Sequence, residues 1–264
     1  MSGGGLGYRI TMEYFVDRQS IVRKIWGKSD TILFVFAGAS AEFALNKAVD
    51  WLYYTGRLPA DPLGRLFSTV MYARDIVFSE KEKAEKTIDK ITSIHRAIET
   101  ARGDQIPDWA YRDVLFMLIH YSLAAYELLE RKLDDKEKED LYDVFYRMGI
   151  RMGLKDLSPR FDQWLTQRNE HLHSNLEKTH YTIDLFKQYK KHLGATRFFI
   201  LKESQKLVVP RHVNELLGLG KVKWIAPVLL TYKLSRKVKL DGFIKSLILP
   251  AAYKKQIREL DVTE

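Results

Sequence analysis

Apolar residues recur along most of this chain at the three- and four-residue steps that place them on one face of an α-helix. The clearest stripe, with steps of 4, 3, 4 and 3, consists of Ala84, Ile88, Ile91, His95 and Ile98. Strand-like patterns are confined to 197–201 and 206–209, and both lie beside helical patterns. The periodicity therefore predicts an all-α fold, built as a single large helical bundle.

Capping residues mark the expected helix boundaries. Asp61-Pro62 is typical of an N-cap followed by a first-turn proline, and Ser79 with Glu82 forms a capping-box pattern. Glycines at C′ positions are expected to end four helices, at Gly103, Gly153, Gly194 and Gly218. The approximate helices predicted are 11–26, 30–56, 62–78, 80–101, 108–132, 135–153, 159–174, 177–193, 196–206, 211–217, 222–233 and 241–258.

The composition limits the classes of protein that remain. With 264 residues and 46% apolar content, the chain can bury a substantial core. We predict a flexible N-terminus over 1–10, a helical domain over 11–235 and a basic helical extension over 236–264. The absence of cysteine excludes disulfides, iron–sulfur clusters, thiolate-ligated haem and cysteine zinc sites.

The N-terminal residues lack the basic and apolar regions of a signal peptide. No run approaches the roughly 18 apolar residues that a membrane-spanning helix needs. Glu42 and Lys47 interrupt the longest candidate. We therefore expect a cytoplasmic protein whose contact with membranes is at most peripheral.

His95 replaces an aliphatic residue on an inward-facing stripe. A buried imidazole needs a partner, because an unsatisfied polar group in an apolar core is costly. That partner can be a backbone carbonyl, a carboxylate or a metal. On the preceding helix, Arg65 and Thr69 are one turn apart and share a face. For Arg65, a surface ion pair with Asp61 is the alternative to a place in a pocket.

These residues carry a family resemblance. The motif GRLFST (64–69), followed by SIHRAI (93–98), is similar to the shared signature of the MpaB-type and rubber-oxygenase (latex-clearing) family. The order, spacing and helical setting of the motifs carry the likeness, which covers roughly residues 20–235. Further similar segments are 43–58, 117–130 and 141–154.

The resemblance implies a catalytic domain that binds b-type haem and uses its iron to activate dioxygen. It implies that His95 is the proximal iron ligand and that Arg65 and Thr69 line the haem pocket as catalytic residues. Arginine can neutralise a haem propionate, and a threonine hydroxyl can donate a hydrogen bond to dioxygen or order a water. His120, within a nearly continuous apolar helix, is a further candidate for this pocket, with structural packing as the alternative.

The sequence also departs from the family pattern. Latex-clearing members have a lysine where this chain has Ser68, and many bacterial members have His-Pro where this chain has Asn46-Lys47. The glutamate that acts as a base in rubber cleavage has no clear equivalent. Glu42 and Asp50 are acidic residues near its expected position, but neither can be assigned to it. We therefore expect a small apolar substrate, such as a prenylated or lipid-like molecule, and not rubber.

Three further histidines, His171, His173 and His180, suggest a metal site. However, residues i and i+2 of a helix point about 200° apart, so His171 and His173 cannot share one ion on a helix. We therefore disfavour zinc there.

Positive charge is concentrated in the last third of the chain. Residues 181–264 contain 17 lysines and arginines and 7 acidic residues, a net charge of +10, whereas the rest has a net charge of −1. Apolar segments interleaved with lysine favour either solvated amphipathic helices or reversible contact with an anionic membrane. Nucleic-acid binding is not expected, because no recognisable motif organises the basic residues.

Two alternatives to a haem-dependent oxygenase remain at this point. One is a haem-binding helical protein without catalysis. The other is a peripheral membrane or partner-binding helical module without a cofactor, in which His95 is simply packed in the core.

Overall fold

The computed structural model describes residues 13–56, 60–227, 229, 231 and 232. In this part of the chain the secondary structure is helical, with two isolated β-bridges and no strand. The all-α prediction is confirmed. The helices are α1 (Ile21–Trp26), α2 (Ser29–Phe43), α3 (Asp50–Tyr54), α5 (Pro62–Phe78), α6 (Lys81–Arg102), α7 (Asp108–Leu129), α8 (Asp135–Met152), α9 (Phe161–Ser174), α10 (His180–Val208) and α11 (Arg211–Leu217).

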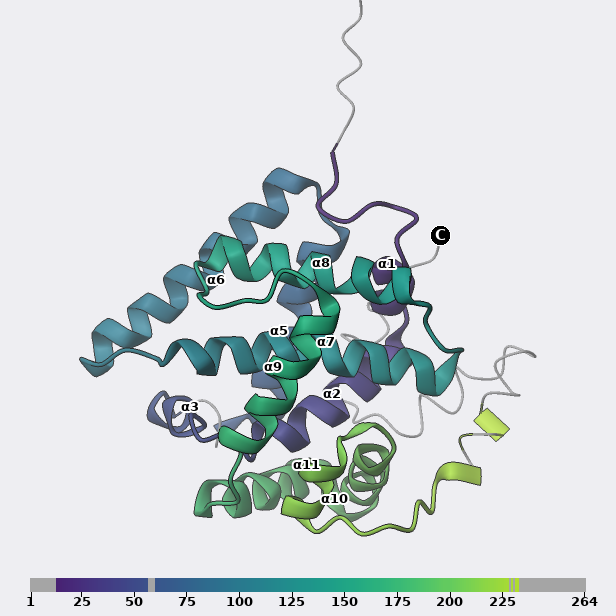
Figure 1. Cartoon of the computed structure of the whole chain (residues 1–264). Helices are drawn as coiled ribbons and strands as arrows, with labels where there is room; N and C mark the ends of the chain where they lie inside the picture. Colours follow the sequence, from purple (N-terminus) through teal and green to yellow (C-terminus); the bar gives the residue numbers. More distant parts are fainter. Residues whose placement is uncertain (1–12, 57–59, 228, 230, 233–264) are drawn as a thin grey trace, which may run out of the picture.

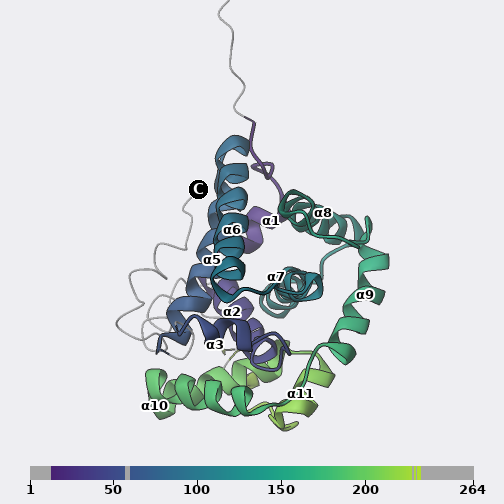
Figure 2. The same ribbon diagram turned by 90° about the vertical axis from the view of Figure 1, so that its left-hand side faces the viewer.

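Helix α7 forms the centre of the bundle. Figure 2 shows it nearly along its axis, with α5 and α6 on one side, α9 on the other, α8 above, and α10 and α11 below. Its buried residues point in all directions around the axis, which is typical of a helix surrounded by protein. Figure 1 shows α2 crossing beside α7. Positions on α7 therefore reach different neighbours and different pockets.

Several predicted boundaries agree with the structure. Asp61 caps α5 by accepting a hydrogen bond from the backbone N–H of Gly64 at 2.9 Å. Asp134 and Glu137 form a capping box at the start of α8. Gly194 interrupts α10 with non-helical angles (φ 74°, ψ 169°), close to the predicted break between 177–193 and 196–206. The capping box predicted from Ser79 and Glu82 is wrong, because the Ser79 hydroxyl instead donates to Asp75 at 3.3 Å.

Two predicted helices are shorter than expected. The predicted helix 11–26 begins only at Ile21, where the Ser20 hydroxyl accepts from Val22 N–H at 3.2 Å. The predicted helix 30–56 is split at Asn46, whose side chain accepts from Ala48 N–H at 2.9 Å and whose backbone bridges Leu176. Asparagine side chains compete with helical hydrogen bonds in this way.

Other predictions concern residues outside the described part of the chain. These are the proposed terminal segments 1–10 and 236–264, the helix 241–258 and the end of the helix 222–233. The predicted start of the helix 222–233 is wrong, because residues 222–225 are described and are not helical. Among the described helices, none combines the length and the apolarity that crossing a bilayer requires.

Close contact between α2 and α7 depends on Gly38. A Cβ atom at this position would lie 2.1 Å from Cδ1 of Tyr121, whose side chain is fully buried. Overpacking a core usually costs about 1–3 kcal/mol, whereas Gly→Ala in a helix gains about 1 kcal/mol. We predict that Gly38→Ala lowers the free energy of unfolding in urea.

Gly149→Ala is the matched control for Gly38→Ala. Its Cβ would lie 2.5 and 2.8 Å from the flexible ends of Leu157 and Leu115, which can move aside, and at an ordinary contact distance of 3.5 Å from Leu154. The loss of stability should be clearly smaller than for Gly38→Ala. Equal or greater stability of Gly38→Ala relative to the unmodified protein would contradict the proposed packing constraint.

Candidate active site

The predicted pair on α5 lies together in the structure. The Arg65 guanidinium donates to the Thr69 hydroxyl at 3.0 Å and to the Ser68 hydroxyl at 3.3 Å. All three side chains are partly buried. The arginine is thus oriented by two hydroxyl groups of its own helix, and its charge stays close to the adjacent helix α6.

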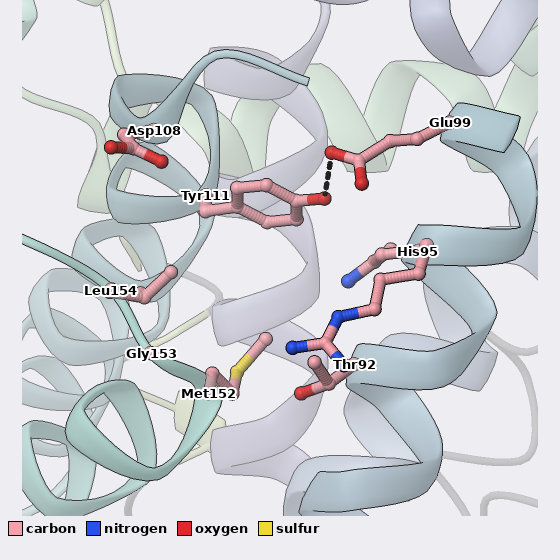
Figure 3. Close-up of a pocket in the computed structure, with 9 residues that line it drawn as sticks. Thr92, His95, Glu99, Asp108, Tyr111, Met152, Gly153 and Leu154 are labelled. Atoms are coloured by element: carbon pink, nitrogen blue, oxygen red, sulfur yellow. Dashed lines mark hydrogen bonds between the residues drawn. The ribbon is translucent and has the colours of Figure 1, made fainter. Parts of the chain in front are cut away.

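His95 lies on α6 at the edge of a cavity of about 120 Å³. Its ring centroid is 5.1 Å from that of Tyr111 on α7. Figure 3 shows side chains of α6 facing those of α7 and the end of α8 across this space. The cavity is lined by Thr92, His95, Arg96, Glu99, Asp108, Tyr111, Met152, Gly153 and Leu154.

The environment of His95 keeps its imidazole neutral. Burial and, to a smaller extent, the positive charge of Arg65 together lower the pKa of His95 to about 4, and Glu99 partly opposes both effects. Within the described residues, Nδ1 of His95 is buried and lacks a hydrogen-bond partner. A neutral imidazole with a buried, unsatisfied nitrogen is well suited to ligate a metal.

Glu99 and Tyr111 complete the polar side of the cavity. The Tyr111 hydroxyl donates to Glu99 at 2.9 Å, and the backbone N–H of Ile106 donates to the same carboxylate oxygen at 3.0 Å. Sequence reasoning did not identify either residue as part of the site. Glu99 could have been found, because it lies one turn after His95 on the same face. Tyr111 carried no such signal, since only the tertiary fold brings it to α6.

His120 lies in a second pocket, about 460 Å³, which shares no lining residue with the first. The pocket lies between the second half of α7 and the end of α10, and its lining includes Glu127 and Lys132. Burial and the charge of Arg168 lower the pKa of His120 to about 4, although the charge of Glu42 and a hydrogen bond to the Val208 backbone oppose this shift. Among the described residues, His120 therefore does not line the cavity next to His95. Its predicted role at the cofactor stays a prediction.

A buried ion pair joins α2 to α9 near His120. Arg168 donates to both oxygens of Glu42, at 2.6 and 2.5 Å, and the Tyr121 hydroxyl donates to Glu42 at 2.7 Å. Arg168 and the Tyr121 hydroxyl hold the pKa of Glu42 below its usual value despite complete burial. From the sequence, Glu42 was only an acidic residue near the expected position of a catalytic base. A carboxylate within an apolar stretch is itself a signal for such a pair.

A second buried polar group surrounds Asp113 on α7. The Asn46 amide donates to Asp113 at 2.8 Å, and the Nδ1 atom of His171 contacts the same carboxylate. His173 instead stacks on His212, with ring centroids 4.5 Å apart, so His171 and His173 face different neighbours. Among the described residues, no group of three or more His, Asp or Glu side chains is placed to hold a metal ion.

Asp50, the other acidic residue near the expected position of a catalytic base, forms an ion pair. Its carboxylate lies 2.8 Å from the Arg102 guanidinium at the end of α6. Arg102 also lies over the ring of Trp51, 4.0 Å from its centroid. These contacts connect α3 to α6, the helix that carries His95.

Comparison with known families assigns the chain to a class of enzymes. The family described as "ER-bound oxygenase mpaB/B'/Rubber oxygenase, catalytic domain" matches residues 25–235. The chain therefore belongs to the MpaB/rubber oxygenase family and carries its catalytic domain, and the resemblance stated from the sequence is confirmed. No curated protein and no solved structure matches the chain.

The two neutral histidines predict a pH dependence of stability. Their pKa values are about 4 in the folded protein, against 6.5 for an unperturbed histidine. Between these values the unfolded chain binds protons that the folded chain does not, so the free energy of unfolding falls as the pH falls. The loss reaches up to about 3 kcal/mol for each histidine. His95→Gln should reduce this slope in urea unfolding of the protein without added haem, measured from about pH 7 to about pH 4.

His192→Gln is the control for His95→Gln, because His192 is exposed on α10. It should keep the slope of the unmodified protein, including the part that carboxylate protonation contributes. The same slope in His95→Gln as in His192→Gln would show that His95 is not held neutral by the fold.

Proposed function

We propose that this protein is a haem-b-dependent oxygenase that uses dioxygen to oxidise or cleave a small apolar substrate, such as a prenylated or lipid-like molecule. The observation that carries the proposal is the buried, unsatisfied Nδ1 atom of His95, at the edge of a cavity and close to Arg65. Membership of an oxygenase family supports the same reaction class.

The donor groups fit a haem. His95 would ligate the iron through a neutral imidazole nitrogen, which does not first have to lose a proton at neutral pH. Arg65 would neutralise a propionate, because guanidinium is permanently charged and donates in a fork. Thr69, whose hydroxyl accepts from the Arg65 guanidinium at 3.0 Å, would keep that side chain oriented, and it does not line the cavity next to His95. Haem iron, when bound, would supply the activation of dioxygen.

The space next to His95 suits a small molecule better than a macrocycle. At about 120 Å³, the cavity has room for a few water-sized molecules, dioxygen among them. Ligand pockets usually measure about 300–1,000 Å³. Haem binding at His95 would therefore require the surrounding side chains to move apart. Met152 and Leu154 form the apolar part of a cavity wall that is otherwise mostly polar, so the proposed apolar substrate rests on family membership and not on this wall.

Ser68 distinguishes the proposed pocket from that of rubber-cleaving enzymes. Its hydroxyl donates to the Arg65 carbonyl at 2.7 Å and so stays at its own helix. A serine is shorter than lysine and carries no charge. We therefore propose that no side chain at position 68 approaches the iron. Arg65 does not line the cavity next to His95, where the positive side chain is Arg96, but its charge acts on His95 from α5.

Substitution of His95 tests the proposal. His95→Ala should lose most of its bound haem, because the iron would lose its protein ligand. The measurement is the ratio of haem to protein after reconstitution and removal of excess haem. His120→Ala is the matched control, since it also removes a buried neutral imidazole but from a separate pocket.

His120→Ala should keep the haem content of the unmodified protein. Circular dichroism of both variants checks that the helical fold is intact. Full haem content in His95→Ala, or loss of haem only in His120→Ala, would contradict the assignment of His95 as the ligand. Haem binding without turnover of any substrate would instead favour the non-catalytic haem-binding alternative.

A further inference from the structure

Five consecutive exposed residues follow α11. Residues 220–224, with the sequence GKVKW, lie between the buried Leu219 and the partly buried Ile225. Trp224 is 67% exposed and Val222 is 58% exposed, and Trp224 is the most exposed large apolar side chain among the described residues. Figure 1 shows the chain leaving α11 along the lower edge of the molecule. We refer to residues 220–224 as the KVKW loop.

The backbone of the KVKW loop is held in place by side chains of α10 and α11. Lys206 donates to the Val222 backbone carbonyl at 3.0 Å, and Glu203 accepts from the backbone N–H of Trp224 at 2.9 Å. Lys206 and Glu203 are themselves buried and paired with each other. The Asn214 amide donates to the Gly220 carbonyl at 3.2 Å.

These contacts have a consequence for the loop's side chains. Because α10 and α11 bind the loop through its main chain, the protein fixes the backbone and leaves the indole and the valine in solvent. An exposed tryptophan on an immobilised backbone has already lost much of the conformational freedom that binding would otherwise cost. The loop is therefore preorganised for contact with another surface.

The charges around the loop are positive. Residues 202–227 contain five basic and two acidic residues, a net charge of +3. Both acidic residues are engaged, Glu203 with Lys206 and Glu215 with Arg211. Within the described residues, Lys221 and Lys223 form no ion pair. The pKa of Glu215 is lowered first of all by its hydrogen bond with Arg211, and Lys221 adds only a small contribution.

We propose that the KVKW loop binds the surface of an anionic membrane. An indole ring is amphipathic and suits the headgroup region of a bilayer, and adjacent lysines attract anionic headgroups while their stems lie along apolar surface. The alternation of lysine, valine, lysine and tryptophan brings both requirements to one short segment. This inference does not depend on the haem assignment, which rests on other residues.

Vesicle sedimentation of the whole chain tests the proposal. The protein should sediment with phosphatidylcholine vesicles that contain phosphatidylserine at low salt, and should be released by high salt or by omission of phosphatidylserine. Trp224→Ala should weaken binding. Lys221→Ala combined with Lys223→Ala should also weaken it, by about fivefold for each lysine.

Matched controls separate the loop from general surface properties. Leu165→Ala removes another exposed apolar side chain, 50% exposed on α9. Lys136→Ala combined with Lys178→Ala removes two exposed lysines elsewhere. Both controls should bind vesicles as tightly as the unmodified protein, and circular dichroism should show the same fold for all variants.

Tryptophan fluorescence gives a second measurement at the proposed contact. Binding to vesicles should move the emission of the unmodified protein to shorter wavelength, and Trp224→Phe should remove most of this shift, because Trp26, Trp51 and Trp164 are already buried and Trp109 is partly buried at the start of α7. Absence of binding to phosphatidylserine vesicles at low salt would overturn the proposal. Binding that is unchanged in the loop variants would also overturn it, since the contact would then lie elsewhere.

Discussion

The arrangement of this bundle depends on the close packing of α2 against α7 and on the ion pair buried beside that contact. Gly38 lets the ring of Tyr121 lie against the backbone of α2, and the Tyr121 hydroxyl then reaches Glu42 one turn further along. Glu42 in turn holds Arg168 of α9. Removing one partner of such a pair is strongly destabilising, since it leaves an unpaired buried charge. Three helices are therefore fixed in register around one carboxylate.

The candidate site inherits its geometry from this central arrangement. Because α7 is held on α2 and α9, its first half presents Tyr111 to His95 of α6, while its second half presents His120 to a different pocket. The two histidines share a neutral state caused by burial, yet only His95 has an unsatisfied nitrogen next to a permanently charged arginine. This difference, and not burial alone, singles out His95 as the proposed ligand.

Periodicity and capping residues predicted the positions and ends of the helices. Features that depend on tertiary contacts could not be predicted from the sequence. The helix that carries Arg65 and the helix that carries His95 were located to within a residue or two, because stripes and caps such as Asp61 are local signals. The break at Asn46 was missed because it depends on a bridge to Leu176, far along the chain. For the same reason, the sequence indicated His95 and Arg65 as neighbours but gave no sign of Tyr111.

The account rests on His95 as the ligand of a haem iron, and the vibrational spectrum of the reconstituted protein tests this most directly. The 264-residue chain is mixed with haem, reduced and examined by absorption and resonance Raman spectroscopy. We predict a Soret band and an iron–imidazole stretching band that shifts when the histidines of the protein carry a heavier nitrogen isotope, and that is absent in His95→Ala but kept in His120→Ala. Absence of haem binding, or bound haem without an iron–imidazole band, would contradict the account.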